Sequence, residues 1–511
     1  MSTASAPLLD EGPRLRRNLN IWEAIGVSLA LMAPSMAANI NPQAAAMNAG
    51  RAVPLVFLIA TIAVLLVAHT FVRLSQKFNH AGSVYGYLGA TLGPRWGVTA
   101  GWALAGTYMF YAVLTAMAAG IFGSTFLNDV GIWKNPPTWS GFLIGGLALL
   151  LVWYLAVAPI RLTTNTLLII EGTTVLLIIV VAAVVLFRLL NHTAPNGNTF
   201  TWSVFKPAAG ITQSALFLGV VFGFLSFAGF EAASTLGEET NNPRRDIPRA
   251  ILGVALFGGA YFVIVTAIEV MGFGTSAKDL VAFTSSGSLL GDLGSQFIAS
   301  WVGNVVTLGT AISGFACALA CTVGAARLLY ALSRDGIGPR RLATVSKKRG
   351  TPSVAVATTV IAAYLTIAIT IIFFKAEPFD TYSWTATIGT LVLLVVYFLA
   401  CVGAIRVLFF SKERTTPLWE IVLPIGAMIV LGYTLYRNVV PYPTGAGKWL
   451  PIIAALWILF AVAVVVLRPK LAREAGVRLA VEDGLMDAGG APLVGATSGA
   501  PVDSAEKNGV S

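Results

Sequence analysis

Charged residues are scarce in this chain: Asp, Glu, Lys and Arg make up 11% of its 511 residues, whereas 56% are hydrophobic. Soluble globular proteins carry about 25% charged residues, which keep their surfaces hydrated. The composition therefore excludes an ordinary soluble domain and indicates a chain that a lipid bilayer solvates in part.

Cysteine and histidine are also rare, with three of each. Cys317, Cys321 and Cys401 lie in apolar stretches, at spacings that suit neither a disulfide framework nor a metal cluster. The histidines are dispersed, so we expect no metal site and no cofactor. Nor do we expect an enzyme, because catalysis within a membrane requires titratable or nucleophilic side chains that converge at one depth, and no such set is apparent.

The N-terminus lacks the apolar core and the small-residue cleavage site of a signal peptide. Residues 1–20 are polar and contain two prolines, and we interpret them as a cytosolic tail. At the other end, residues 469–511 are rich in Ala and Gly, and we expect a disordered cytosolic tail there.

Apolar runs of about 20 residues, the length of a helix that crosses the hydrocarbon layer, recur between the two tails. Barrel strands would instead alternate apolar and polar residues over about ten positions. We therefore predict an all-α polytopic membrane protein with about twelve transmembrane helices over residues 21–468. The predicted spans are Ile21–Ala49, Pro54–Leu74, Gly97–Leu127, Ser140–Pro159, Thr163–Leu190, Thr212–Leu236, Ala250–Phe273, Ala299–Ser333, Val354–Phe374, Trp384–Phe410, Leu418–Tyr436 and Pro451–Leu467.

The basic residues sort by side of the membrane. With both termini in the cytosol, 25 of the 33 Lys and Arg residues fall on the cytosolic side of the twelve spans. This asymmetry follows the positive-inside rule and accounts for the net charge of +10 without a nucleic-acid partner. We expect a multi-pass protein of the cytoplasmic (inner) membrane, with the lipid bilayer as its partner.

Two predicted spans carry helix-breaking residues. The first contains Pro34 and Ser35 near its middle, and the sixth contains Gly229 between two phenylalanines. Proline removes a helical hydrogen bond, and glycine lowers the cost of local unwinding. A plain proline kink and close helix packing remain the alternatives.

The two breaks are five spans apart, as an inverted repeat of five plus five helices requires. On this basis we place the repeats at about 21–190 and 212–410, with accessory helices at 418–436 and 451–467. Freed amides at such breaks suit a carboxylate, and freed carbonyls suit an ammonium group. A small zwitterion such as an amino acid matches both ends of this site.

Acidic residues within apolar runs are candidates for coupling or binding. Glu171 lies near the middle of the fifth span and Glu231 follows the break in the sixth. An ionised carboxylate in hydrocarbon costs several kcal/mol, so each must be protonated, paired or functional, and a purely structural hydrogen-bonded carboxyl is the alternative. Glu269 lies close to the outer end of its span, where we expect it to reach the interface. Among the aromatic residues, Tyr108 and Tyr111 are candidates to wall a substrate pocket.

Three stretches resemble the amino acid/polyamine/organocation (APC) permease superfamily. They are FAGFEAASTLGEETNNPRRDIPRAI from Phe227 to Ile251, AGSVYGYLGATLGPRWGVTAGW from Ala81 to Trp102, and ARLLYALSRDGIGP with the following TPSVAV between Ala326 and Val356. The resemblance covers about residues 21–468. It implies the leucine-transporter-like (LeuT-like) five-plus-five fold with broken helices 1 and 6, and transport of amino acids or related amines by alternating access.

The resemblance also implies where the substrate binds. In that superfamily the two breaks hold the backbone of the substrate, which here falls on Ala33, Pro34, Ser35, Met36 and Ala37 and on Ser226, Phe227, Ala228, Gly229 and Phe230. Many relatives have a glycine-rich first break, and some proton-coupled relatives have a lysine where this chain has Glu171.

The expected function is secondary active transport of an amino acid or related amine; we favour protons as the coupling ion, while sodium symport and exchange stay open. A polyamine or cationic amino acid exchanger, a permease-like sensor and a membrane enzyme are the alternatives. For the loop between spans six and seven, we predict an inner gate formed by Glu238, Glu239, Arg244 and Arg245; a solvated turn is the other interpretation.

Overall fold

The computed structural model describes residues 20–78, 84–158, 162–236, 240–346, 350–411 and 416–482, and these contain no β-strand. The α-helices are α1 (Ile21–Met32), α2 (Pro34–Ala49), α3 (Val53–Lys77), α4 (Val84–Leu92), α5 (Pro94–Asp129), α6 (Ser140–Val157), α7 (Leu162–Leu190), α8 (Gln213–Phe227), α9 (Pro243–Phe273), α10 (Ala277–Ser285), α11 (Leu289–Phe297), α12 (Ser300–Arg334), α13 (Ser353–Phe374), α14 (Pro378–Phe409), α15 (Val422–Arg437), α16 (Trp449–Leu467) and α17 (Pro469–Glu482). The 3₁₀ helices are η1 (Gly50–Ala52), η2 (Trp202–Phe205), η3 (Ala232–Leu236), η4 (Arg340–Ala343), η5 (Leu418–Ile421) and η6 (Gly445–Lys448).

Eleven helical segments of the described chain are long and apolar enough to cross a membrane. The first, Ile21–Lys77, has 57 residues, far more than the roughly 20 that one crossing needs. It contains α1, α2 and α3, which are separated at Ala33 and at Gly50. The prediction of an all-helical multi-pass membrane protein is confirmed, while the count of twelve crossings stays a prediction.

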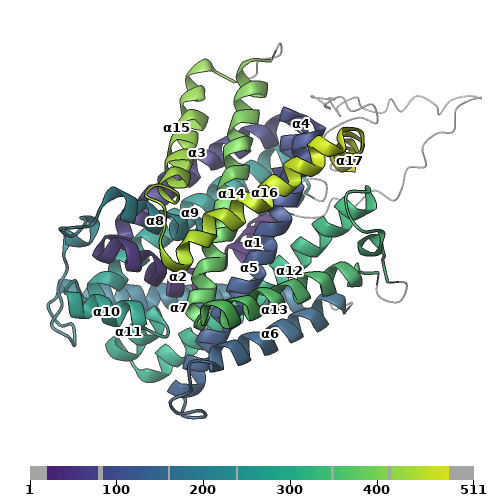
Figure 1. Cartoon of the computed structure of the whole chain (residues 1–511). Helices are drawn as coiled ribbons and strands as arrows, with labels where there is room; N and C mark the ends of the chain where they lie inside the picture. Colours follow the sequence, from purple (N-terminus) through teal and green to yellow (C-terminus); the bar gives the residue numbers. More distant parts are fainter. Residues whose placement is uncertain are drawn as a thin grey trace, which may run out of the picture.

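The bundle has two ends (Figure 1). One end carries the C-terminal helix α17, which packs on α4 and α5, and we call it the terminal face. The opposite end carries the short helices α10 and α11, which pack on α2 and which we call the lid.

Small residues let the long helices approach closely at the centre of the bundle. Helix α5 lies against α6, α12 and α14, and α3 lies against α9. A Cβ atom on Gly120 of α5 would lie 2.1 Å from the Gly141 carbonyl oxygen of α6, and one on Gly314 of α12 would lie 3.0 Å from the Ala119 nitrogen. In membranes, close contact of this kind replaces the hydrophobic effect as the source of helix association.

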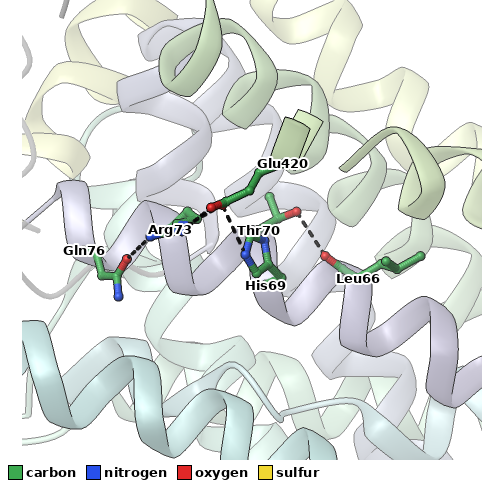
Figure 2. A network of polar contacts seen from close by, with 6 residues as sticks. All are labelled: Leu66, His69, Thr70, Arg73, Gln76 and Glu420. Carbon is green, nitrogen blue, oxygen red and sulfur yellow. Dashed lines mark hydrogen bonds and ion pairs between the residues drawn. The ribbon is translucent and has the colours of Figure 1, made fainter. Parts of the chain in front are cut away.

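A buried carboxylate anchors α15 to α3 near the terminal face (Figure 2). Glu420, in η5 at the start of α15, is 3% exposed and accepts hydrogen bonds from the Arg73 guanidinium, with 2.7 Å from Nε to Oε2. His69 Nε2 lies 3.3 Å from the same oxygen, and Arg73 also donates to Gln76 at 3.1 Å. A buried charge needs such partners to offset its lost hydration.

The helix ends differ from the predictions at three places. Residues Pro469–Glu482 form α17, so the prediction of disorder is wrong for this part of the tail. Ala472 and Ala475 are buried, and a Cβ atom on Gly476 would lie 2.0 Å from the Pro94 carbonyl oxygen. The remaining residues of the tail lie outside the described part.

Helices α9 and α14 begin earlier than the sequence predicts. Pro243 begins α9, seven residues before the predicted start of span seven. Pro378 begins α14, where Glu377 and Asp380 form a reciprocal capping box that satisfies the first amides. Polar residues near a helix start therefore belong to the helix although they lie outside the apolar run.

Candidate functional site

The first predicted break lies at Ala33. This residue has left-handed backbone angles (φ 44°, ψ 58°), ends α1 and precedes Pro34 at the first position of α2. A non-glycine residue in this conformation costs about 1–2 kcal/mol. The break is therefore a true interruption rather than a proline kink, and it leaves amides at the start of α2 without helical acceptors.

Glu171 of α7 supplies the acceptor for this helix start. Its Oε1 accepts a hydrogen bond from the Ser35 backbone nitrogen at 2.9 Å, and the Ser35 hydroxyl lies 2.9 Å from both carboxylate oxygens. Ser313 of α12 also neighbours the carboxylate. One of the amides predicted to attract a substrate carboxylate, that of Ser35, is thus already in contact with a carboxylate of the protein.

The second predicted break follows Phe227. There α8 ends, Ala228 is extended, and Gly229 has φ 101°. The chain resumes as the 3₁₀ helix η3. The sequence predicted an interrupted span here, and the interruption is present, but its second half is one short 3₁₀ segment within the described residues rather than an α-helix.

The two breaks touch each other. A Cβ atom on Gly229 would lie 2.7 Å from the Leu31 Cβ and 3.3 Å from the Met32 nitrogen, so only glycine fits. Ser28 of α1 bridges the second break, since its hydroxyl donates to the Phe230 carbonyl at 3.1 Å and accepts from the Ala233 nitrogen at 2.9 Å. The ends of α1 and α8 therefore form one joint in the middle of the bundle.

A chain of hydrogen bonds runs from this joint to the lid. Asn39 Nδ2 donates to the Ser35 carbonyl at 2.9 Å, and Asn39 Oδ1 accepts from the Ser288 hydroxyl at 3.0 Å and from the Leu290 nitrogen at 2.9 Å. The Glu171 carboxylate, Ser35, Asn39 and the start of α11 are thus connected. Sequence reasoning assigned Asn39 no role, although a buried amide in an apolar run signals such a partner.

The lid also contains a titratable group. The Asp292 carboxylate accepts a hydrogen bond from the Ser286 hydroxyl at 2.6 Å. Asp292 is exposed at the lid surface, and the partial burial of its carboxylate raises its pKa; the Ser286 hydroxyl acts in the opposite direction, and the charge of Asp129 at the end of α5 raises the pKa further. Asp292 is therefore a titratable group at the surface of the lid.

A second polar cluster joins α2, α8 and α14. Asn41 Nδ2 donates to the Ser226 hydroxyl at 2.6 Å, and the Tyr382 hydroxyl donates to Asn41 Oδ1. Ser226 in turn donates to the Phe222 carbonyl at 2.9 Å. The predicted substrate residue Ser226 is therefore held by the protein itself in this conformation.

Glu231 lies just after the second break and is 5% exposed. Its Oε2 atom has no hydrogen-bond partner within 3.5 Å among the described residues, and the Tyr397 hydroxyl of α14 is the side-chain donor placed to interact with the carboxylate. Tyr108 of α5 also interacts electrostatically with Glu231. Tyr111, one turn further along α5, instead bonds Thr390 at 3.0 Å. Of the two candidate tyrosines, Tyr111 is therefore hydrogen-bonded to Thr390 and Tyr108 is not.

The other predicted binding residues are buried at the two breaks. Met36 and Ala37 lie in the first turn of α2. Phe227 packs on Phe262 of α9, and Phe230 packs on Phe71 of α3. Both rings therefore support the joint through helix packing.

The structure describes two of the four residues of the predicted inner gate. Arg244 and Arg245 lie exposed in the first turn of α9 at the terminal face. Glu238 and Glu239 lie outside the described residues. The gate stays a prediction.

Glu269 does not reach the interface as the sequence suggested. Its side chain is 0% exposed, and neither carboxylate oxygen has a hydrogen-bond partner among the described residues. Helix α9 packs there on α7, α10 and α11, which cover its end. The lid helices, which lie beyond the apolar run, bury a residue that would otherwise meet water.

Two interrupted helices that meet inside a helical membrane bundle form the architecture of secondary transporters. The chain belongs to the amino acid permease family, whose model matches residues 19–477. It is therefore a membrane transporter of the APC type and not an enzyme.

Curated relatives include transporters of amino acids and of an amine. The branched-chain amino acid permease BcaP of Bacillus subtilis is 26% identical over 61% of this chain and 66% of its own length. The low-affinity putrescine importer PlaP of Escherichia coli K12 is 25% identical over 64% of this chain and 69% of its own. Cationic amino acid transporter 4 of Mus musculus is 25% identical over 60% of this chain and 48% of its own.

A solved structure shares the fold at low sequence identity. The manganese transporter of Eremococcus coleocola, bound to an aromatic bis-isothiourea compound, superposes with a TM-score of 0.52 at 14% identity, over 92% of this chain and 100% of that one. At this identity the likeness concerns the fold alone.

Proposed function

We propose that this protein is a proton-coupled secondary transporter of an amino acid or a related amine, with Glu171 as the proton carrier. The observation that carries the proposal is the contact of Glu171 with the first break, where its carboxylate accepts from the Ser35 backbone and hydroxyl. An ionised Glu171 occupies the amide that a substrate carboxylate would use. Protonation removes this charge and weakens its hydrogen bonds.

Proton binding and substrate binding are then linked at one amide. A protonated Glu171 releases the Ser35 N–H, and the start of α2 becomes available to the carboxylate of a substrate. The linkage is reciprocal, because a substrate that occupies this amide favours the protonated form of Glu171 by the same factor. The hydrogen bonds from Ser35 through Asn39 to the start of α11 link the protonation of Glu171 to the lid, and in the proposed cycle to its opening.

A second candidate function, the exchange of cationic amines, has its own supporting observation. Glu231 Oε2 is buried next to the second break and has no hydrogen-bond partner within 3.5 Å among the described residues, although the Tyr397 hydroxyl interacts with the carboxylate. An ammonium group of the substrate would satisfy this oxygen. This reading predicts that Glu231 sets the charge of the substrate while Glu171 sets the coupling.

The basic residues orient the proposed transporter. With the terminal face in the cytosol, most Lys and Arg residues meet the cytosolic side of the cytoplasmic membrane. The lid then faces the exterior. Labelling of single introduced cysteines with a membrane-impermeant reagent tests this orientation.

The direct test is transport by the purified protein in sealed liposomes. Uptake of radiolabelled leucine, arginine, putrescine and spermidine is measured with and without an inward proton gradient. We expect saturable uptake of one class, raised by the gradient. Glu171→Gln should abolish accumulation driven by the gradient and retain substrate binding, because glutamine fills the same space without a titratable group.

Gly172→Ala is the matched control, since a Cβ atom at this neighbouring position meets no atom within 4 Å. It should transport like the unaltered protein. Gradient-driven accumulation that is unchanged in Glu171→Gln would contradict the coupling role. If none of the four compounds binds or moves under any gradient, the proposed substrate class is wrong.

A further inference from the structure

Two hollows lie along the seam between α6 and α13, which run side by side (Figure 1). The first, of about 690 Å³, lies towards the lid face and is lined by Trp139, Leu143, Ile371, Lys375 and Glu377 among others. The second, of about 480 Å³, lies towards the terminal face, where Leu150, Trp153 and Tyr154 of α6 meet Ser353, Val354 and Ala357. Both volumes fall within the range of small-molecule sites, about 300–1,000 Å³.

One contact separates the two hollows. The Tyr364 hydroxyl of α13 donates a hydrogen bond to the Gly146 carbonyl of α6. Gly146 has no side chain, and a Cβ atom there would lie 3.7 Å from the Tyr364 ring. The helices are therefore joined in the middle and part on either side, so each hollow opens to one half of the bilayer and neither forms a path across it.

The side chains at the hollows face the lipid. Leu143 at the first hollow is 45% exposed, and Tyr154 at the second is 66% exposed. Apolar side chains that remain exposed along a membrane-spanning helix meet acyl chains rather than water. The natural occupant of an apolar groove at this depth is a hydrocarbon chain.

The rim of the first hollow carries charges that select a head group. Lys375 follows α13 in a left-handed conformation (φ 50°), is exposed, and forms no ion pair with any described residue. Its ammonium suits a phosphate, which it binds as a point charge. Trp139 also lines this hollow and is exposed, and tryptophan is the residue type enriched at membrane interfaces.

Glu377 provides the second charge of the rim. It is exposed, and its carboxylate caps the start of α14, which holds it in place. A carboxylate has about four acceptor positions, so it can accept further hydrogen bonds from an ammonium group. The rim therefore offers one cation for a phosphate and one anion for a primary ammonium.

We propose that the hollow towards the lid face binds one phosphatidylethanolamine molecule. Its acyl chains lie along Leu143 and Ile371, its phosphate meets Lys375, and its ammonium group meets Glu377. The second hollow has no charged residue among its described lining. It accepts an acyl chain without selecting the head group, and it serves as an internal comparison.

Native mass spectrometry of the full chain, delipidated in detergent, tests the proposal. The protein is titrated with dioleoyl phosphatidylethanolamine, phosphatidylcholine and phosphatidylglycerol. We expect one phosphatidylethanolamine to bind more tightly than either other lipid, because the quaternary ammonium of phosphatidylcholine has no proton to donate and phosphatidylglycerol has no ammonium. Further lipids should bind without preference.

Two variants address the site itself. Lys375→Gln should weaken the binding of the first phosphatidylethanolamine about fivefold, as expected for one basic residue near a membrane surface. Leu143→Trp fills the hollow from an exposed position, so it should remove the tight site without unfolding the protein. Lys278→Gln, an exposed lysine on α10 of the same face, is the matched control and should change nothing.

Three results would each overturn the proposal. Equal phosphatidylethanolamine binding by the Lys375→Gln and Lys278→Gln variants would show that Lys375 at the rim does not contribute to binding. Competition by water-soluble phosphoethanolamine at equal concentration would identify a soluble head group rather than a lipid as the ligand. Self-association of the delipidated protein that Leu143→Trp abolishes would show that a second copy of the chain covers this seam.

Discussion

Replacement of Gly229 by alanine tests the joint between the two broken helices. The residue has φ 101°, and an added Cβ atom would lie 2.7 Å from the Leu31 Cβ and 3.2 Å from the Leu31 carbonyl carbon. The backbone conformation costs an alanine about 1–2 kcal/mol. Overpacking against a fixed neighbour adds about 1–3 kcal/mol, so we expect the folded state to lose about 2–5 kcal/mol in total.

The assay is thermal unfolding in detergent, followed by the loss of the monodisperse peak on size exclusion, with substrate binding measured on the protein that remains folded. Gly229→Ala should lower the Tm clearly and weaken binding. Gly253→Ala is the matched control, because its Cβ atom meets nothing within 4 Å on the exposed side of α9. A helical glycine replaced by alanine in open space gains about 0.5–1 kcal/mol.

The comparison distinguishes contact at the break from a general effect of alanine. If Gly229→Ala has the Tm and the affinity of Gly253→Ala, the two breaks do not meet as described. A lowered Tm with unchanged substrate binding would support the contact between the two breaks but show that it does not contribute to the substrate site.

Three further changes test other parts of the molecule. Arg73→Met should cost up to about 3 kcal/mol, the lower end of the range for a broken buried ion pair, because Glu420 stays buried while the Arg73 side chain is 32% exposed, and Arg73→Met with Glu420→Met should recover most of this loss in the same thermal assay. Gly476→Ala should detach α17, because the new methyl group meets the Pro94 carbonyl oxygen; faster hydrogen exchange confined to α17 would show it, and unchanged exchange would speak against the docking. Asp292→Asn should flatten the pH dependence of stability only slightly, because Asp292 is exposed and solvent screens its charge: with a pKa raised in the folded state, Asp292 stabilises most below its ordinary value of 3.8, and this contribution is lost as the pH rises through the raised value.

Much of the architecture is predictable from local patterns. Runs of apolar residues define the spans, and the all-helical multi-pass fold follows because a bilayer offers no hydrogen bonds to an open backbone. Pro34 and Gly229 mark the two interruptions, since these residue types weaken a helix wherever they stand. Boundaries were predicted less well where polar residues extend a helix beyond its apolar run, as at Pro243 and Pro378.

The candidate site depended on the tertiary structure. Glu171 was recognisable as an unusual acid, but its contact with Ser35, 136 residues away, depends on how α7 is rotated and placed against α2. The same holds for Asn39, whose amide reaches the lid 249 residues later, and for Glu269, which the lid helices cover.

Local chemistry within one or two helical turns sets three features: the need for a bilayer, the positions of the helical spans and the two breaks. Packing between distant helices sets which groups those breaks contact. The contacts of Ser35 with Glu171 and of Gly229 with Leu31 arise from the packing of helices far apart in the chain, and the orientation of a helix about its axis is fixed by all of its neighbours together.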